Sequence, residues 1–158
     1  MGYSDKELNA LDKSRFSFLA ECQRLQEQLS CDVTAVSLQD YPELDIKWPY
    51  VWGNRNEKYK YLTVRYGKGL AGKVIATGAP LAIAVFPEDI SGKATDYPIM
   101  LAEQLVSAYA VPLIWQGNPK GALLVGYRHP YDWKKSDDHT ITKAAGKMES
   151  LLPLYFTH

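Results

Sequence analysis

The 158-residue sequence has few cysteines, no long apolar run and no excess of either charge. Its two cysteines, Cys22 and Cys31, are too few for a disulfide framework and lack the Cys-x-x-Cys spacing of a zinc site. We therefore expect reduced, partly buried thiols, and neither a metal nor a cofactor. No stretch reaches the roughly 18 apolar residues of a membrane-spanning helix, and residues 1–7 lack the apolar core of a signal peptide. These absences predict a cytoplasmic protein without a membrane anchor.

Charge is balanced, because 18 basic and 18 acidic residues are interleaved along the chain. A neutral protein has no broad positive field with which to neutralise nucleic-acid phosphates or an anionic membrane surface, so we expect neither as a partner. The length and the 46% share of apolar residues suit a single core. We therefore interpret residues 1–158 as one domain, with its core from about 4 to 156.

Hydrophobic periodicity predicts a helix at each end of the chain. The capping box of Ser4 and Glu7 begins the first helix, which is expected to end near Ser30. The last helix is expected to begin at Ser136. Its apolar stripe comprises Ile141, Ala145, Met148, Leu152 and Tyr155.

Strands and two short helices are predicted between these terminal helices. The strands are expected at 32–39, 45–52, 62–66, 80–85, 108–114 and 121–127. Pro49 marks an edge or a bulge, and the loop 115–120 joins the last two strands into an antiparallel hairpin. The short helices are expected at 70–77, closed by Gly78, and at 97–106, after the polar loop 86–96. This pattern predicts an α+β domain in which the terminal helices cover one face of an antiparallel sheet.

Gly67-x-Gly69-x-x-Gly72 has the spacing of a dinucleotide-binding turn. That function requires a buried apolar strand before the turn and an acidic residue at a strand end about 20 positions later. Here the preceding strand is mixed in polarity, and Glu88 and Asp89 lie in a polar loop. A structural role explains the three glycines better than dinucleotide binding does, because glycine allows the dihedrals of a tight turn and the close packing of a helix on a sheet. The first amides of the following helix remain unpaired donors, which attract small anions.

Three segments resemble the corresponding parts of GAF domains: the turn from Tyr66 to Pro80, the strand 107–113, and residues 117–126. The resemblance covers nearly the whole chain. It implies a central antiparallel sheet with the terminal helices on one face and a ligand pocket under loops and short helices on the other. Trp48, the pair 70–71 and the run 97–99 are further similar to nitrate receptors within that family.

This resemblance implies that nitrate is held by main-chain N–H groups between aromatic walls. The implied donors are the amides of Leu70, Ala71 and Ile99, and the implied walls are Trp48, Tyr97 and Pro98. Pro98 has no N–H, so the first free donors of its helix are expected at Ile99 and Met100. Nitrite, iodide, bicarbonate and chloride could compete for the same amides.

Several of these residues also have simpler interpretations. Trp48 could be an ordinary core aromatic, and Tyr97 could be a surface ring beside a turn. Arg65 and Lys68 flank the glycine turn and could touch the anion directly, although such charges are usually solvated. His129, His139 and His158 are interpreted as solvated surface residues.

GAF-type free methionine-(R)-sulfoxide reductase is the enzymatic alternative. That enzyme needs pocket cysteines, whereas this sequence has Ala71 in the turn and no cysteine between 86 and 100. A bilin photoreceptor would also need a cysteine there, and a cyclic-nucleotide domain would need a more polar pocket. An interaction module, with no ligand or with another small ligand, remains open. We expect no enzymatic activity.

The resemblance implies a partner protein, a sensor histidine kinase whose autophosphorylation is restrained by the ligand-free receptor and released by nitrate. The chain ends with the predicted domain, so we expect such a partner to carry the signal. The exposed side of the terminal helices is the candidate surface for the kinase or for a second copy in a homodimer. The loop 86–96 is the candidate moving part, closing with Tyr97 over the anion.

Overall fold

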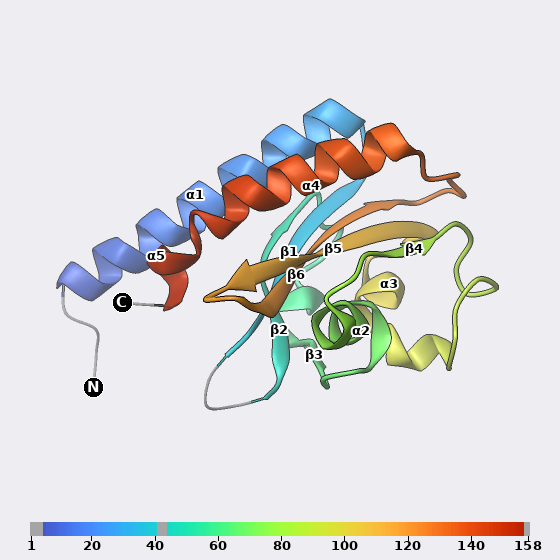
Figure 1. Cartoon of the computed structure of the whole chain (residues 1–158), viewed down its shortest axis with the longest axis horizontal. Helices are drawn as coiled ribbons and strands as arrows, with labels where there is room; N and C mark the ends of the chain where they lie inside the picture. The colour runs from blue at the N-terminus through green and yellow to red at the C-terminus, as the bar shows by residue number, and fades with distance from the viewer. Residues whose placement is uncertain (1–4, 41–43, 157–158) are drawn as a thin grey trace.

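The computed structural model describes residues 5–40 and 44–156 (Figure 1). Helix α1 (Asp5–Leu29) ends where predicted, at Ser30, whose φ of 52° is left-handed. Ser4, and with it the predicted capping box, lies outside the described residues. Across the described residues, the helices are too short or too polar to span a bilayer.

The C-terminal helix begins one residue earlier than predicted and is interrupted. Helix α4 (Lys135–Glu149) stops before Ser150, and α5 (Leu152–Phe156) follows after a turn. Pro153 explains the interruption, because its ring would clash with the carbonyl of Glu149 if α4 continued. The predicted stripe is therefore divided between two helices, with Leu152 and Tyr155 on the second.

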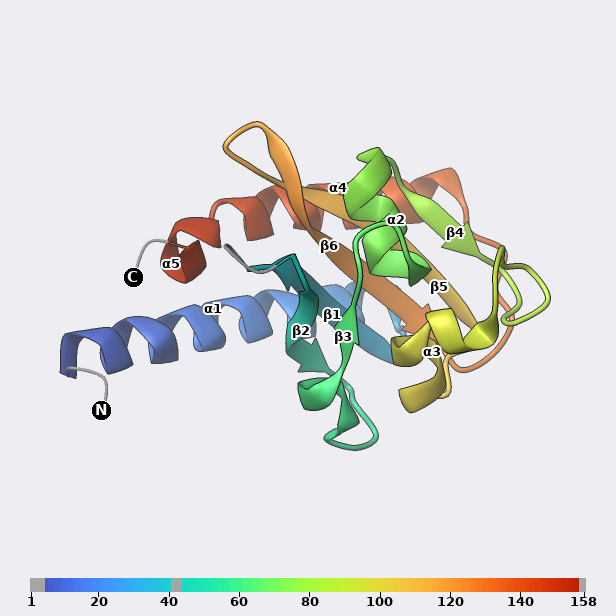
Figure 2. The same cartoon turned by 90° about the horizontal axis from the view of Figure 1, so that it is seen from below.

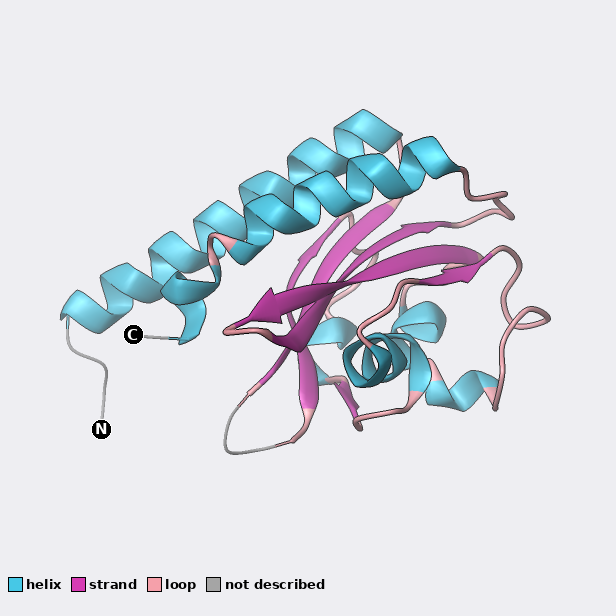
Figure 3. Cartoon of the chain, in the orientation of Figure 1, coloured by secondary structure: helices cyan, strands magenta, loops and turns pink. Residues whose placement is uncertain are grey.

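The predicted α+β class and antiparallel sheet are confirmed. Six strands are arranged in the order β3-β2-β1-β6-β5-β4, and every neighbouring pair is antiparallel (Figure 3). They are β1 (Val33–Gln39), β2 (Ile46–Trp52), β3 (Thr63–Val64), β4 (Leu81–Ile83), β5 (Ser107–Trp115) and β6 (Asn118–Tyr127). β3 and β4 are shorter than the predicted strands 62–66 and 80–85.

The hairpin between β5 and β6 has a much tighter turn than the predicted loop 115–120. Trp115 pairs with Asn118, which leaves only Gln116 and Gly117 between the strands. Both residues have positive φ, 53° and 82°, as a type I′ turn requires. Such a turn matches the twist of the sheet, so the strands continue to its tip.

The sheet separates two cores (Figures 1 and 2). Helices α1, α4 and α5 lie over one face, and α2 (Gly69–Thr77) and α3 (Pro98–Ala102) lie over the other. Alternation along the central strands supplies both cores: in β1, Val33 and Ala35 face α2, whereas Val36 and Leu38 face the long helices. The face under α2 is the one on which the GAF resemblance implies a ligand pocket.

Pro49 marks a bulge, which is one of its two predicted meanings. Val36 pairs with Tyr50 and Leu38 pairs with Lys47, so Trp48 and Pro49 stand opposite the single residue Ser37. A bulge of this kind changes which face the following side chains point to. As a result Trp48 packs in the core under α2, whereas Tyr50 packs under α1.

The two short helices differ in how well they agree with the predictions. Helix α2 is closed as predicted by Gly78, which has φ 68° and donates its N–H to the carbonyl of Val74 at 2.8 Å. Helix α3 ends at Ala102, not near Val106, because Gln104 has φ 53° and the Leu105 N–H folds back to the carbonyl of Met100 at 2.9 Å. Two 3-10 turns, at Lys58–Tyr61 and Ala94–Asp96, were not predicted.

Candidate functional site

The N-termini of α2 and α3 are in direct contact. Gly69, the first residue of α2, has φ 63°, and a Cβ added there would lie 2.3 Å from the carbonyl oxygen of Asp96. Asp96 immediately precedes Tyr97, the N-cap of α3. Only glycine permits this approach, so the turn glycine brings two helix N-termini to one place.

The preceding turn is held by its own backbone. The Gly67 N–H donates to the carbonyl of Gly72 at 3.0 Å, and the Lys68 N–H donates to the carbonyl of Arg65 at 3.0 Å. A Cβ on Gly72 would lie 2.3 Å from the Arg65 carbonyl oxygen. Gly67 and Gly69 therefore supply the turn dihedrals as predicted, whereas Gly72 permits close packing of α2 on its own turn and not on a strand. The dinucleotide interpretation fails, because its parallel βαβ unit is absent from the described residues.

Backbone donors are left unpaired at both helix starts. Neither N-cap, Lys68 or Tyr97, caps its helix with a side-chain hydrogen bond. Within residues 5–40 and 44–156, the amides of Leu70, Ala71 and Ile99 make no backbone hydrogen bond. The expectation for Met100 is wrong, because its N–H donates to the carbonyl of Tyr97 at 3.1 Å. The three amides that the resemblance implied are thus available to a ligand.

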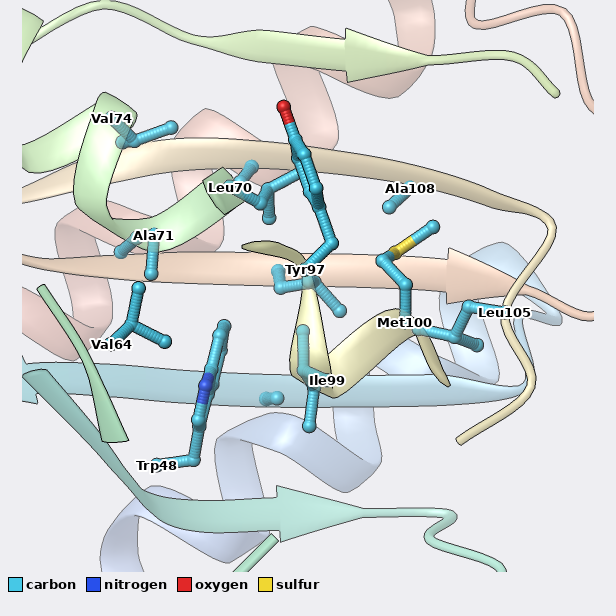
Figure 4. Packing of buried hydrophobic residues seen from close by; sticks show 14 of the residues in the cluster. Trp48, Val64, Leu70, Ala71, Val74, Tyr97, Ile99, Met100, Leu105 and Ala108 are labelled. Atoms are coloured by element: carbon cyan, nitrogen blue, oxygen red, sulfur yellow. The ribbon is translucent and has the colours of Figure 1, made fainter. Parts of the chain in front are cut away.

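Trp48 is more than a core aromatic in one respect. Its side chain is 2% exposed, and its indole Nε1 is buried without a hydrogen-bond partner among the described residues. Figure 4 shows the ring rising from β2 between Val64 and Ile99, towards the start of α2. A buried N–H without an acceptor costs about 1–3 kcal/mol, and an anion in this place would remove that cost.

The structure brings the six predicted site residues together. Five of them lie in one buried apolar cluster and are each 2% exposed: Trp48, Leu70, Ala71, Tyr97 and Ile99. The sixth, Pro98, is half-buried and lines a hollow of about 280 Å³ beside them. Tyr97 is therefore not a surface ring, and its hydroxyl points past Leu70, away from Trp48 (Figure 4).

The two charged residues of the glycine turn lie at the outside of this cluster. Arg65 and Lys68 are exposed and line the same hollow as Pro98, together with Asp96. This position agrees with the expectation that they are solvated. Because both side chains lie at the hollow, their charges contribute to the electrostatic potential there.

Sequence reasoning missed Lys73, the one charged residue of α2. Its Nζ donates to the Tyr97 hydroxyl at 2.9 Å and also bonds to the Ser91 hydroxyl. The signal was present in the sequence, because Lys73 interrupts the otherwise apolar and small residues of Gly69–Thr77. A lysine among apolar and small residues indicates that its ammonium group has a hydrogen-bond partner elsewhere in the fold.

The C-terminal end of α3 is fixed by a buried carboxylate. The Glu103 side chain is fully buried, and its Oε1 accepts from the Arg55 N–H at 2.7 Å and from Arg128 at 2.9 Å. Arg128 also donates to the Glu103 carbonyl, and Asn56 donates to the Ala102 carbonyl at 3.2 Å. These bonds hold the helix whose first turn carries Ile99.

Both cysteines lie on the opposite side of the sheet. Cys22 and Cys31 are buried in the core under α1 and α4. Burial raises the thiol pKa of each to about 12, so both stay protonated at neutral pH. Neither thiol is placed to act in the cluster around Trp48.

The chain belongs to the GAF family. A family model described as the GAF domain matches residues 18–149. A comparison with curated protein sequences finds no match.

Solved structures of similar proteins agree with this assignment. A mutated form of the NreA protein from Staphylococcus aureus, altered in its nitrate binding site, is 32% identical, with a TM-score of 0.71 over 80% of this chain and 94% of that one. The type II free methionine-R-sulfoxide reductase of Thermoplasma acidophilum is 17% identical, with a TM-score of 0.71 over 93% and 97%. A domain of a Sinorhizobium meliloti protein described as a putative two-component sensor histidine kinase is 14% identical, with a TM-score of 0.69 over 85% and 88%. The last two share the fold alone.

Proposed function

We propose that this protein is a cytoplasmic nitrate receptor. The observation that carries the proposal is the meeting of two helix N-termini, with unpaired amides at Leu70, Ala71 and Ile99, beside the unpartnered indole N–H of Trp48. Similarity to NreA, a protein with a nitrate binding site, supports nitrate as the anion.

The chemistry of nitrate suits such a site. The ion is planar, singly charged and weakly hydrated, so it needs a few aimed donors and tolerates apolar and aromatic walls. Each hydrogen bond to a charged group contributes about 1.5–3 kcal/mol, and each helix dipole about 0.3–2 kcal/mol, before the costs of binding are subtracted. We therefore propose micromolar affinity, with Trp48 as a fourth donor in addition to its role as a wall.

The same cluster argues against the reductase alternative. Reduction of a sulfoxide by this family of enzymes needs thiols at the ligand, and the only two cysteines of the sequence are Cys22 and Cys31. Both are protonated and lie on the far side of the sheet. We propose a binding protein without catalytic activity.

Calorimetric titration tests the proposal. Purified, chloride-free protein is titrated with sodium nitrate, and sodium sulfate at matched ionic strength serves as the control. We expect saturable one-to-one binding of nitrate and a nitrate-dependent rise of the melting temperature. Absence of both would rule out nitrate, and parallel titrations with nitrite and iodide would then search for another anion.

We further propose that the receptor acts through a sensor histidine kinase, as the family resemblance implies. The exposed side of α1 and α4 is the proposed contact surface for the kinase or for a second copy. Autophosphorylation of the kinase should fall when ligand-free receptor is added and recover when nitrate is added. An equal rate with and without receptor would refute this partner while leaving nitrate binding untouched.

A further inference from the structure

Lys73 joins three segments around the proposed anion site. It lies on α2, one turn after Gly69, and its Nζ donates to the Tyr97 hydroxyl at 2.9 Å and to the Ser91 carbonyl at 3.3 Å. The Ser91 hydroxyl is a further partner. The Tyr97 hydroxyl donates in turn to the Ser91 carbonyl at 3.0 Å. We call these contacts the Lys73–Ser91–Tyr97 network.

The network acts on the part of the chain that forms the site. Tyr97 is the N-cap of α3, two residues before the Ile99 amide, and its ring is buried against Phe86 with centroids 5.9 Å apart. Ser91 belongs to the loop 86–96, which is otherwise polar and mostly exposed. The ammonium of Lys73 also lies 5.4 Å from the centroid of the Tyr97 ring, within the range of a cation–π contact.

These contacts favour one arrangement of the loop. The Tyr97 hydroxyl accepts from a cation and donates to a carbonyl, so each bond polarises the other. Bonds to an ionised donor are the stronger kind, and three of them converge on one Nζ. Phe86 and Ile90 pack the loop against the buried cluster, and the bonds from Lys73 to Ser91 tie its middle to α2.

We propose that Lys73 is a positioning residue of the anion site. It fixes Tyr97 and the loop 86–96 on α2, and thereby holds the Ile99 amide opposite the amides of Leu70 and Ala71. The inference rests on the proposed nitrate-binding function and deepens it. In this proposal the lysine does not touch the anion; it holds Tyr97, the residue at the start of α3, against α2.

Three variants test the network, K73M, Y97F and K73M/Y97F, and K143M is the matched control. Methionine keeps the length of the lysine side chain without its charge, and phenylalanine removes only the hydroxyl. Lys143 is exposed on α4, on the other side of the sheet, so K143M removes the same charge far from the loop. Hydrogen exchange of residues 86–100 is measured without ligand, and nitrate affinity is measured by calorimetry.

We expect K73M to speed exchange in the loop and to weaken nitrate binding about tenfold, with a smaller loss in Y97F. The double variant should bind no worse than K73M, because both changes break the same network. K143M should behave as the wild type. Unchanged exchange in both K73M and Y97F would overturn the inference, and so would wild-type affinity in K73M.

The two readouts separate this inference from the proposed function. If the wild type binds no nitrate, the proposed function fails. Faster exchange in ligand-free K73M and Y97F would then still support the network, and unchanged exchange would refute it. If the wild type binds nitrate but K73M binds it equally well, the positioning role of Lys73 is refuted and the receptor proposal stands.

Discussion

Gly69 and Asp96 lie in contact where α2 and α3 begin, so close that a methyl group on Gly69 would lie 2.3 Å from the Asp96 carbonyl oxygen. Residues 27 positions apart in the sequence thus set the spacing between two helix starts. Any side chain at Gly69 must push the two starts apart or change the backbone. The proposed site depends on this spacing, because its donors are divided between the two helices.

Gly69→Ala is expected to destabilise the fold by about 2–4 kcal/mol, since the left-handed φ and the backbone clash both oppose a side chain. Gly146→Ala is the matched control. A Cβ there meets no heavy atom within 4 Å, and Gly146 lies in the last turn of α4, so the change is expected to be neutral or stabilising by up to about 1 kcal/mol. Urea unfolding measures both, and equal stability of the two variants would contradict the close contact.

Trp48→Phe separates a ligand donor from a core aromatic. The indole N–H has no partner to lose among residues 5–40 and 44–156, so the variant should lose about tenfold in nitrate affinity while its melting temperature falls only by the cost of the smaller ring. In the comparison variant Trp133→Phe, a bond from Nε1 to the Ile83 carbonyl at 3.0 Å is lost. That variant should lose stability and keep its affinity. If Trp48→Phe instead loses stability and keeps its nitrate affinity, Trp48 is a packing residue and not a ligand donor.

The Glu103–Arg128 pair predicts an asymmetric response to mutation. Arg128→Met leaves a fully buried carboxylate without its charged partner, and we expect a loss of about 3 kcal/mol. Glu103→Gln keeps an acceptor for the Arg55 N–H and leaves a charge that is 32% exposed, so its cost should be about 1 kcal/mol. Thermal unfolding compares the two. A larger loss for the glutamine variant would contradict this account.

The cysteines should be inert in the folded protein. Burial raises both thiol pKa values to about 12, so an aromatic disulfide reagent should label neither Cys22 nor Cys31 in mildly alkaline buffer until the protein is unfolded. Above the ordinary thiol pKa of 9.0, the unfolded chain loses protons that the folded chain keeps, so stability falls as the pH rises towards 12. Rapid labelling of the native protein would contradict the burial.

The sequence predicted the parts of the fold that depend on local pattern. The order of elements and the Gly78 cap follow from periodicity and from residues with few allowed dihedrals, and Pro49 marks a bulge, which is one of the two features predicted for it. Two of the errors occur where the backbone uses unusual dihedrals in ordinary residues. Gln104 ends α3 early, and Gln116 makes a two-residue turn, each with φ 53°. Glutamine carries no signal for such a conformation.

The sequence indicated which residues would lie together beside the two helix starts but not their geometry, and their role in binding stays a prediction. A family resemblance can indicate Trp48, Leu70 and Ile99, and the order of residues can indicate that Pro98 lacks a donor. Neither can show that the Trp48 N–H has no acceptor, since that depends on what surrounds the ring after folding. The same holds for Lys73, whose partners lie 18 and 24 residues away.

The proposed donors at the two helix starts belong to the main chain, and this has a consequence for what the protein can sense. Peptide amides and the indole ring neither gain nor lose a proton at any pH at which a protein stays folded, and nitrate is the base of a strong acid. A site built from lysine or histidine would respond to acidity as well as to its ligand. The donors of this one would respond to the anion and not to the proton.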